Sequence, residues 1–253
     1  MNDFPIIEVT PDNIGITGVF CTKNPKSDAY RTKRDWYIKR YAEGLRMHIM
    51  NSQEQKPVSF IEFVPGEFAW RPVEAKEYVF IHCLYVYSKQ DRDKGLGSLM
   101  VEKAGQYAQY LGLNGVAVLA SDGNWIADKR LFLRNGFEVC DKRGRFELLV
   151  RKFSDKVQSP SIIDWTENLH GLDGWHLFYA DQCPWHEKSV KAIAETMQKR
   201  QIPIVVHRIE SASEARQSPS GYGVFAIVKD GELIEDHYIS ETRLLKILKK
   251  EGC

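Results

Sequence analysis

Alternation of apolar and polar residues along the first half of the chain predicts a strand-rich domain with helices between the strands. The most β-rich run is YVFIHCLYVY, residues 78–87, which predicts a buried strand. Shorter apolar runs of the same kind predict further strands over residues 6–10, 45–51, 57–64, 115–120 and 146–152.

Helical spacing of apolar residues predicts the elements between these strands. Aromatic and aliphatic residues recur within 28–45, and an apolar stripe runs from Leu96 to Leu111 before Gly112, which suits a helix end. A shorter helix is expected over 127–135, ended by Gly136.

The polar, proline-containing stretch SDKVQSPS at 154–161 indicates a domain boundary. We therefore expect a first domain over 1–153, a linker over 154–162 and a second domain over 163–253. Beyond the boundary, strands are predicted over 176–180, 204–209, 223–229 and 232–239, with helices over 186–200 and 241–250. Lys229-Asp230-Gly231 predicts a hairpin turn. The fold class is α/β (α+β) in two domains.

Charge and composition exclude several classes of protein. Lysine plus arginine is 35 and aspartate plus glutamate is 34, a net charge of +1 that argues against a nucleic-acid binder. Five scattered cysteines indicate no disulfide framework. The start of the sequence has no signal-peptide pattern, and no apolar run approaches the ~20 residues that span a bilayer. We expect a reduced, cytoplasmic protein without membrane contact.

A glycine turn at residues 92–97 (Arg-Asp-Lys-Gly-Leu-Gly) joins the most β-rich strand to the following helix. Glycines let backbone N–H groups approach a ligand, and the helix N-terminus favours negative charge, so the turn suits a pyrophosphate. It matches neither a Walker A loop nor a dinucleotide fingerprint.

The pattern Arg-x-x-Gly-x-Gly between strand and helix resembles motif A of the GNAT N-acetyltransferases, and Arg134-Asn135-Gly136-Phe137 resembles the end of their motif B. The resemblance covers about residues 4–153. The run 63–72 and the C-terminal part of the chain are together similar to acetyltransferases that carry a YoaP-type C-terminal domain. The resemblance implies acetyl-CoA as cosubstrate and a small-molecule or peptide amine as acceptor. It assigns acetyl-CoA binding to Leu84, Tyr85, Val86, Arg92, Asp93, Lys94, Gly95, Leu96, Gly97, Ser98, Asn124 and Phe132.

Acetyl transfer requires a donor for the developing oxyanion and an acceptor for the amine proton. A backbone N–H near Leu84 or Tyr85 suits the first role. The candidates for the second role are Glu62, Glu67, Glu74, Glu77 and His82. Phe132 stands where many GNAT enzymes have a tyrosine that protonates the CoA thiolate, and a phenyl ring donates no proton. An acceptor pocket is expected from Glu67, Phe68, Trp70, Arg71, Tyr78 and Trp125, although these aromatics also suit a core.

The order of elements in the second domain resembles a thioredoxin-like fold, with Cys183-Pro184-Trp185-His186 where that fold has its redox motif. His186 replaces the second cysteine, so a dithiol cycle within the motif is not expected. A helix N-terminus and a nearby imidazolium favour a Cys183 thiolate. No metal site is expected, because no second ligand pair completes one. Two alternatives stay open: a thiol-dependent redox or sensing protein, and a non-catalytic acyl-CoA-binding module. The acceptor and the oligomeric state are not fixed by the sequence.

Overall fold

The computed structural model describes residues 4–88, 94–122 and 128–253, and these form two compact units. The first unit comprises the chain up to Phe20, Tyr37–Ala69 and Val73–Ile163. The second comprises Cys21–Trp36, Trp70–Pro72 and Asp164–Cys253. Two short stretches of the N-terminal half therefore belong to the second unit, and the stretch 154–163 belongs to the first.

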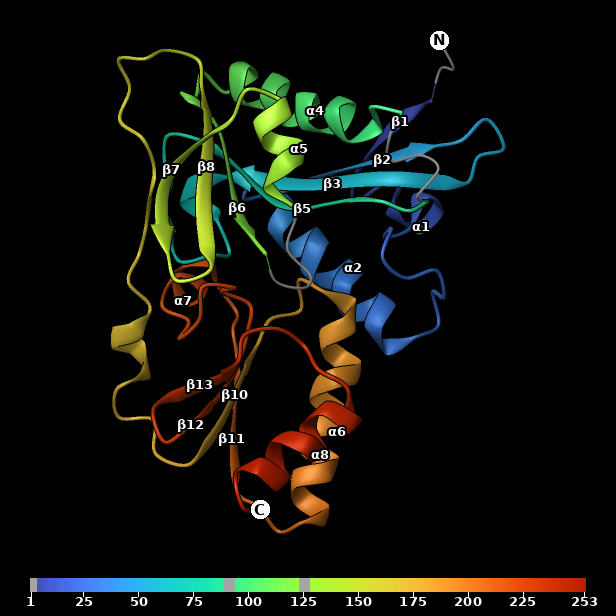
Figure 1. The fold of residues 1–253 in the computed structure, drawn as a ribbon. Coiled ribbons are helices and arrows are strands. Elements are labelled where there is room, and N and C mark those ends of the chain that lie inside the picture. The colour runs from blue at the N-terminus through green and yellow to red at the C-terminus, as the bar shows by residue number, and fades with distance from the viewer. Residues whose placement is uncertain (1–3, 89–93, 123–127) are drawn as a thin grey trace. The chain divides into compact units, whose positions relative to one another are not determined.

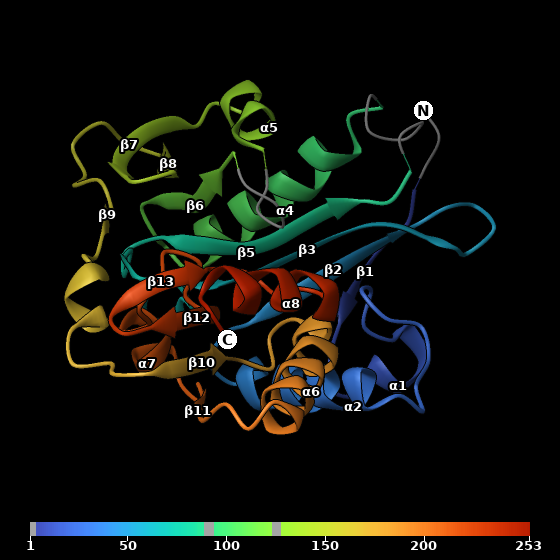
Figure 2. The same ribbon diagram turned by 60° about the horizontal axis from the view of Figure 1, so that its bottom comes forward.

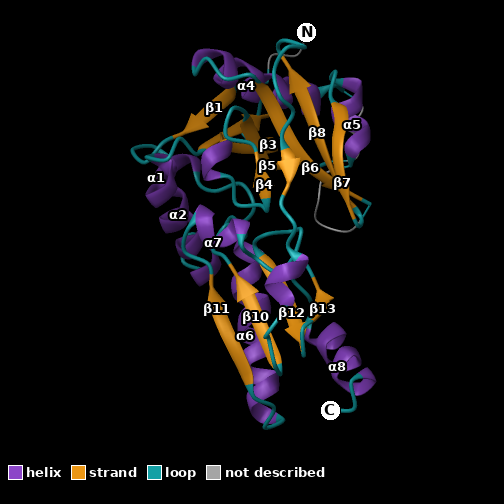
Figure 3. Ribbon diagram, turned by 90° about the vertical axis from the view of Figure 1, so that its left-hand side faces the viewer, coloured by secondary structure: helices purple, strands orange, loops and turns teal. Residues whose placement is uncertain are grey.

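A seven-stranded mixed sheet in the order β1-β2-β3-β5-β6-β8-β7 organises the first unit (Figures 1 and 3). Its strands are β1 (Ile6–Val9), β2 (Arg46–Asn51), β3 (Pro57–Pro65), β5 (Val79–Val86), β6 (Gly115–Ser121), β7 (Glu138–Arg143) and β8 (Phe146–Lys152). Its other elements are α1 (Ile14–Thr17), the end of α2 (Asp28–Tyr41), η1 (Gly66–Phe68), α4 (Leu96–Tyr110), α5 (Lys129–Arg134) and the small sheet of β4 (Val73–Glu74) and β9 (Ser161–Ile162). All pairs in the main sheet are antiparallel except β5 with β6.

Helix α4 covers one face of this sheet, and the apolar stripe predicted from the sequence forms the core there (Figure 1). The helix contributes buried residues at helical spacing, including Met100, Ala104 and Ala108. They pack on the alternate residues Ile61, Phe63, Val79, Ile81, Val116 and Val118 of the three central strands. The period of two in the strands and of 3.6 in the helix explains why the sequence pattern located both.

The C-terminal turn of α2 packs on the opposite face of the sheet. The Tyr37 hydroxyl donates to the Val9 carbonyl at 2.7 Å and accepts from the Met47 amide at 3.0 Å. Burial raises the pKa of Tyr37, so the hydroxyl keeps its proton and ties the helix to β1 and β2.

The second unit contains a four-stranded sheet in the order β11-β10-β12-β13. Strand β10 (Trp175–Tyr179) pairs in parallel with β11 (Ile204–Arg208) and antiparallel with β12 (Phe225–Lys229), which pairs with β13 (Glu232–Glu235). The helices are α6 (Pro184–Lys199), α7 (Ala212–Arg216) and α8 (Glu241–Lys250), with the short η2 (Thr166–Leu169) before β10. Helices α6 and α8 lie side by side (Figures 1 and 2).

Local turn chemistry explains the predicted hairpin of the second unit. Asp230 and Gly231 have φ angles of 49° and 76°, so both central residues of the turn are left-handed, as a tight hairpin requires. By contrast, β7, α1 and α7 were not predicted. β7 is largely exposed and rich in charged residues, and the two helices are too short to show a periodic pattern.

Candidate active site

A β-bulge interrupts β5 in the middle of the sheet. Glu62 of β3 lies opposite Cys83 and Phe63 lies opposite Ile81, so His82 is an extra residue between two paired ones. Bulges bend a strand and redirect a side chain, and they are frequent next to active sites.

The sheet opens between β5 and β6 directly after this bulge. The two strands pair from Val79 and Val116 to Ile81 and Val118 and no further, although both continue. β5 stays paired with β3 as far as Val86, and β6 stays paired with β8 as far as Ser121. The register between β5 and β6 therefore ends five residues before the carboxyl end of β5 at Val86.

Glu62 and His82 meet at the bulge, on the face of the sheet away from α4. His82 Nδ1 lies 3.6 Å from Glu62 Oε1, and the two side chains are 0% and 1% exposed. Burial of an acidic and a basic group together is costly unless they interact, so the pair is the candidate for a proton-accepting site in this unit. Of the five expected base candidates, these are the two that the fold brings together.

The remaining carboxylate candidates occupy other places. Glu67 lies in η1 after β3, beside the Val79 end of β5 and so away from the opening. Glu74 is exposed on β4 in the small sheet, and Glu77 is exposed in the turn before β5. In the sequence, these surface carboxylates next to strand ends were indistinguishable from Glu62 as candidates for the same role.

The N-terminus of α4 has the features expected for phosphate binding. Gly95 caps the helix with a φ of 75°, and a Cβ atom there would meet nothing within 4 Å. The first N–H groups of a helix have no partner inside it and point outward. A Cβ at Gly97 would instead lie 3.1 Å from the Leu131 side chain, so Gly97 permits close packing of α4 on α5. Ser98 Oγ accepts from Asn135 Nδ2 at 3.0 Å, which joins the same two helices.

The expected acetyl-CoA residues divide into exposed and buried groups. Lys94 and Gly95 are exposed, and Tyr85 is 45% exposed, whereas Leu84 packs against the core. Leu96 and Val86 belong to the core cluster, so their side chains support the site from behind. Arg92, Asp93 and Asn124 lie outside the described residues.

Phe132 is a correction to the expected cofactor contacts. Its side chain is 0% exposed, and its ring packs edge-on to Phe137 with centroids 5.4 Å apart. The ring therefore fills the core beneath the site, and no surface of it is offered to a ligand.

An aromatic group that sequence reasoning missed continues from the buried pair along the same face. Phe60 lies opposite Tyr85, two residues along each strand from the pair of Glu62 and Cys83. Phe20 stacks on Phe60 at 4.5 Å, and it lies 6.5 Å from both Tyr85 and Tyr87. Alternation along each strand places Phe60 on the face of Glu62 and Tyr85 on the face of Cys83, but the sequence carries no signal for how the two strands pair or for the position of Phe20.

The aromatic residues expected in an acceptor pocket lie elsewhere. Trp70 and Arg71 are buried in the second unit, where Arg71 Nη1 donates to Gln182 Oε1 at 2.8 Å. The Tyr78 hydroxyl donates to the Gln158 carbonyl, and Trp125 lies outside the described residues. These contacts are structural, so the core interpretation of Trp70 and Tyr78 is the better one.

Cys183 is the N-cap residue of α6, with Pro184 at the first helical position. His186 is 1% exposed, and its Nδ1 donates to the Ala180 carbonyl at 2.7 Å. Burial, together with the positive charges of Arg71 and Lys33, lowers the pKa of His186 to about 4. The imidazole is thus neutral near pH 7, and the expected imidazolium beside Cys183 is not formed. The helix N-terminus at Cys183 still favours a thiolate.

Two models of known protein families match separate parts of the chain. Residues 18–137 match the model of the acetyltransferase (GNAT) family, and residues 203–246 match the YoaP-like model. The chain is 25% identical over 248 residues to a protein of Bacillus subtilis (strain 168) named uncharacterized N-acetyltransferase YoaP, covering 96% of this chain and 97% of that protein.

Solved structures of two N-acetyltransferases are similar to part of the chain. YhbS of Escherichia coli, a GNAT-family protein in complex with CoA, has 15% identity and a TM-score of 0.42, covering 64% of this chain and 91% of its own. PaiA of Thermoplasma acidophilum, in complex with coenzyme A, has 15% identity and a TM-score of 0.43, covering 60% and 99%.

Within residues 4–88, 94–122 and 128–253, no helix has the length and apolar character needed to cross a bilayer. Among the same residues, no three His, Cys, Asp or Glu side chains are grouped in a way that would hold a metal ion.

Proposed function

We propose that this chain is an acetyl-CoA-dependent acyltransferase of the GNAT family and that it transfers the acetyl group to a primary amine at the opening between β5 and β6. The acceptor is a small molecule or a peptide. The observation that carries the proposal is the buried pair of Glu62 and His82 at the bulge, where the sheet opens.

Three groups of this chain have separate tasks in the reaction. The helix N-terminus at Gly95 binds the pyrophosphate of acetyl-CoA through backbone N–H groups. Backbone N–H groups of β5 near Leu84 and Tyr85, beyond the last residue pair with β6, stabilise the oxyanion that develops on the acetyl carbonyl. The pair of Glu62 and His82 accepts the amine proton, directly or through water.

An acceptor screen that follows free CoA release tests the function. With acetyl-CoA present, we expect turnover with at least one amine and a loss of roughly 10²-fold or more in Glu62→Gln and in His82→Gln. Glu74→Gln is the matched control, because this carboxylate is exposed on β4. Binding of acetyl-CoA without turnover of any amine would instead favour the acyl-CoA-binding module.

For the second unit, we propose a thioredoxin-like domain. The proposal is supported by β10 and β11 in parallel, β12 and β13 in an antiparallel hairpin, and a long helix that begins at Cys183 directly after β10. Thiol chemistry at Cys183 is a second candidate function of this unit, and its support is the N-cap position of the sulfur.

A further inference from the structure

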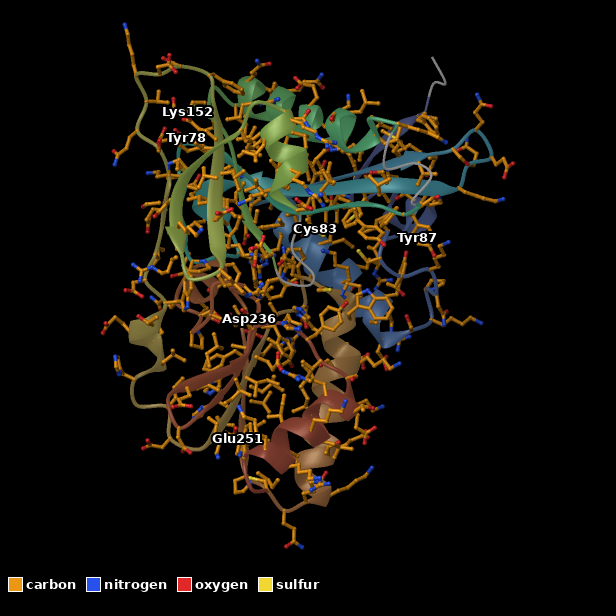
Figure 4. All side chains as sticks on the ribbon, in the orientation of Figure 1. Tyr78, Cys83, Tyr87, Lys152, Asp236 and Glu251 are labelled. Atoms are coloured by element: carbon orange, nitrogen blue, oxygen red, sulfur yellow. The ribbon has the colours of Figure 1, made fainter. Side chains whose placement is uncertain are left out.

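Three aromatic rings of the first unit stand at equal spacing on the face of the sheet away from α4. The ring centroids of Phe20, Tyr85 and Tyr87 are 6.5 Å apart in each of the three pairs. Their planes meet at 61°, 76° and 85°, so the rings are close to mutually perpendicular. Figure 4 labels Tyr87 together with Cys83 of the same strand. We call these three rings the aromatic corner, because their spacing and angles are those of three walls that meet at a corner.

The size of the aromatic corner suits a compact cation. When three perpendicular walls have centres 6.5 Å apart, a point inside the corner lies about 4.6 Å in front of every wall, which is that spacing divided by √2 and is within the range for a cation over a ring face. Groups of aromatic rings bind quaternary ammonium ions in this way. A flat ring could stack on only one wall at a time, whereas a round cation faces all three.

The strands beneath the rings hold the aromatic corner in place. Phe20 stacks on the buried Phe60 ring, with centroids 4.5 Å apart and planes at 24°. Tyr85 lies opposite Phe60 in the register of β3 and β5, and the Tyr87 N–H donates to the Val58 carbonyl at 2.9 Å. The walls are therefore fixed before a ligand arrives, which lowers the cost of binding.

The aromatic corner is accessible from solvent. Tyr85 and Tyr87 are 45% and 62% exposed, whereas Phe20 is partly buried behind them. Two rings of the corner can therefore be reached by a dissolved molecule. Part of the water around a bound cation would be displaced there, which strengthens its attraction to the rings.

The aromatic corner also lies next to the proposed site of acetyl transfer. The N–H groups near Leu84 and Tyr85 are those that would stabilise the oxyanion, and Tyr87 is three residues beyond Leu84 on β5. A strand rises by roughly 3.3 Å per residue, so the corner is within about 10 Å of the reacting carbonyl. An amine at the acetyl group and a cation in the corner can therefore belong to one small molecule.

Resting on the proposed function, we propose that Phe20, Tyr85 and Tyr87 bind a second positive charge of the acceptor. The acceptor class is a short diamine, or an amine that also carries a quaternary ammonium group. One nitrogen is acetylated, and the other stays cationic and lies against the three rings. The task of the aromatic corner is to select and position the acceptor.

Choline and its uncharged isostere, in which a carbon atom replaces the nitrogen, test the aromatic corner without turnover. The two probes have the same shape and differ in charge. In NMR titrations of the full-length protein that follow the tyrosine ring signals, we expect choline to bind more tightly than the isostere by roughly 10-fold or more. Equal affinity for the two probes, or no binding of choline, overturns the proposal.

Variants of Tyr87 separate a ring contact from a merely apolar one. Tyr87→Leu keeps an apolar side chain but removes the ring, and it should weaken choline binding by roughly 5-fold, whereas Tyr87→Phe should keep the affinity. Phe20→Leu should weaken it to a similar extent. Tyr110→Leu is the matched control, because Tyr110 is an exposed tyrosine of α4. Acetyl-CoA affinity should be unchanged in all four variants. Unchanged choline affinity in Tyr87→Leu contradicts the proposal.

Two acceptors of equal length distinguish this inference from the proposed function. Diaminopentane and hexylamine differ only in that an amino group replaces a methyl group. We expect kcat/KM to favour the diamine by roughly 10-fold or more, and Tyr87→Leu to lose this preference through KM. Equal acetylation of the two amines sinks the aromatic corner and leaves the acetyltransferase intact. Choline binding that depends on Tyr87, with no amine acetylated, supports the cation site and removes the acetyltransferase.

Discussion

At the scale of single residues, the glycines in and beside α4 have different tasks. Gly95 and Gly112 flank the helix with φ angles of 75° and 68°, and a Cβ at either position would meet nothing within 4 Å. Gly97 inside the helix is instead limited by the Leu131 side chain. The sequence motif presented Gly95 and Gly97 as one phosphate turn, and packing separates them.

Gly95→Ala should weaken acetyl-CoA binding by roughly 10-fold, because the new methyl group occupies the open space over the helix N-terminus and strains a left-handed residue by about 1 kcal/mol. Titration calorimetry measures the affinity. Gly112→Ala is the matched control: it carries the same strain at the other end of α4 and should leave the affinity unchanged. Equal losses in both variants would mean that Gly95 matters only for helix stability.

Phe132→Tyr should lower the free energy of unfolding by about 1–3 kcal/mol, because the added hydroxyl enters an apolar core. Chemical unfolding measures this, with Phe153→Tyr as control, since Phe153 is 40% exposed and its hydroxyl would meet water. Turnover per folded molecule should not rise. A rise of about 10-fold would show that the hydroxyl reaches the CoA sulfur.

At the scale of elements, the environment of each cysteine depends on the element that holds it. Cys183 caps the N-terminus of the long helix α6, whereas Cys140 lies in β7. Burial and the nearby charge of Asp141 raise the pKa of Cys140 to about 11. The thiolate fractions of the two cysteines should therefore differ strongly at neutral pH.

Alkylation of the native protein, followed by mass spectrometry over a range of pH, should be slower at Cys140 than at Cys183 by at least about 10-fold at pH 8. Cys183 should have an alkylation midpoint below the free-cysteine value of about 8.5, because it caps a helix N-terminus, and His186→Gln should not change that midpoint. A faster Cys140, or a Cys183 midpoint above the free value, would remove the case for a reactive thiol in the second unit.

At the scale of the whole molecule, each unit contains a histidine whose pKa burial lowers to about 4. His48 in β2 stacks on Phe63 at 5.5 Å, and burial lowers its pKa to about 4. In the second unit, burial and nearby positive charges lower the pKa of His186 to about 4. Unfolding returns both imidazoles to water, where they bind protons below about pH 6.5.

Stability should therefore fall as the pH is lowered from about 6.5 to about 4, because between these values the unfolded chain takes up protons that the folded chain does not. Each histidine accounts for at most about 3 kcal/mol of this loss. Unfolding in urea at several pH values should show a smaller loss in His48→Gln and in His186→Gln than in the wild type. His170→Gln, at an exposed position, is the control and should leave the pH dependence unchanged.

Sequence periodicity by itself determined most elements of both units, because an amphipathic helix and a half-buried strand differ in their spacing of apolar residues. It placed α4 between β5 and β6 and the glycine turn before α4, since these depend on neighbours in the chain. The family resemblance came from the same local motifs. Pairing between distant segments decided the rest. The bulge at His82, the burial of Glu62 and the register that sets Cys83 opposite Glu62 depend on how β3 lies against β5, some 20 residues away along the chain. A single sequence carries no signal for that register, so Glu62 was one carboxylate among several until the sheet was formed.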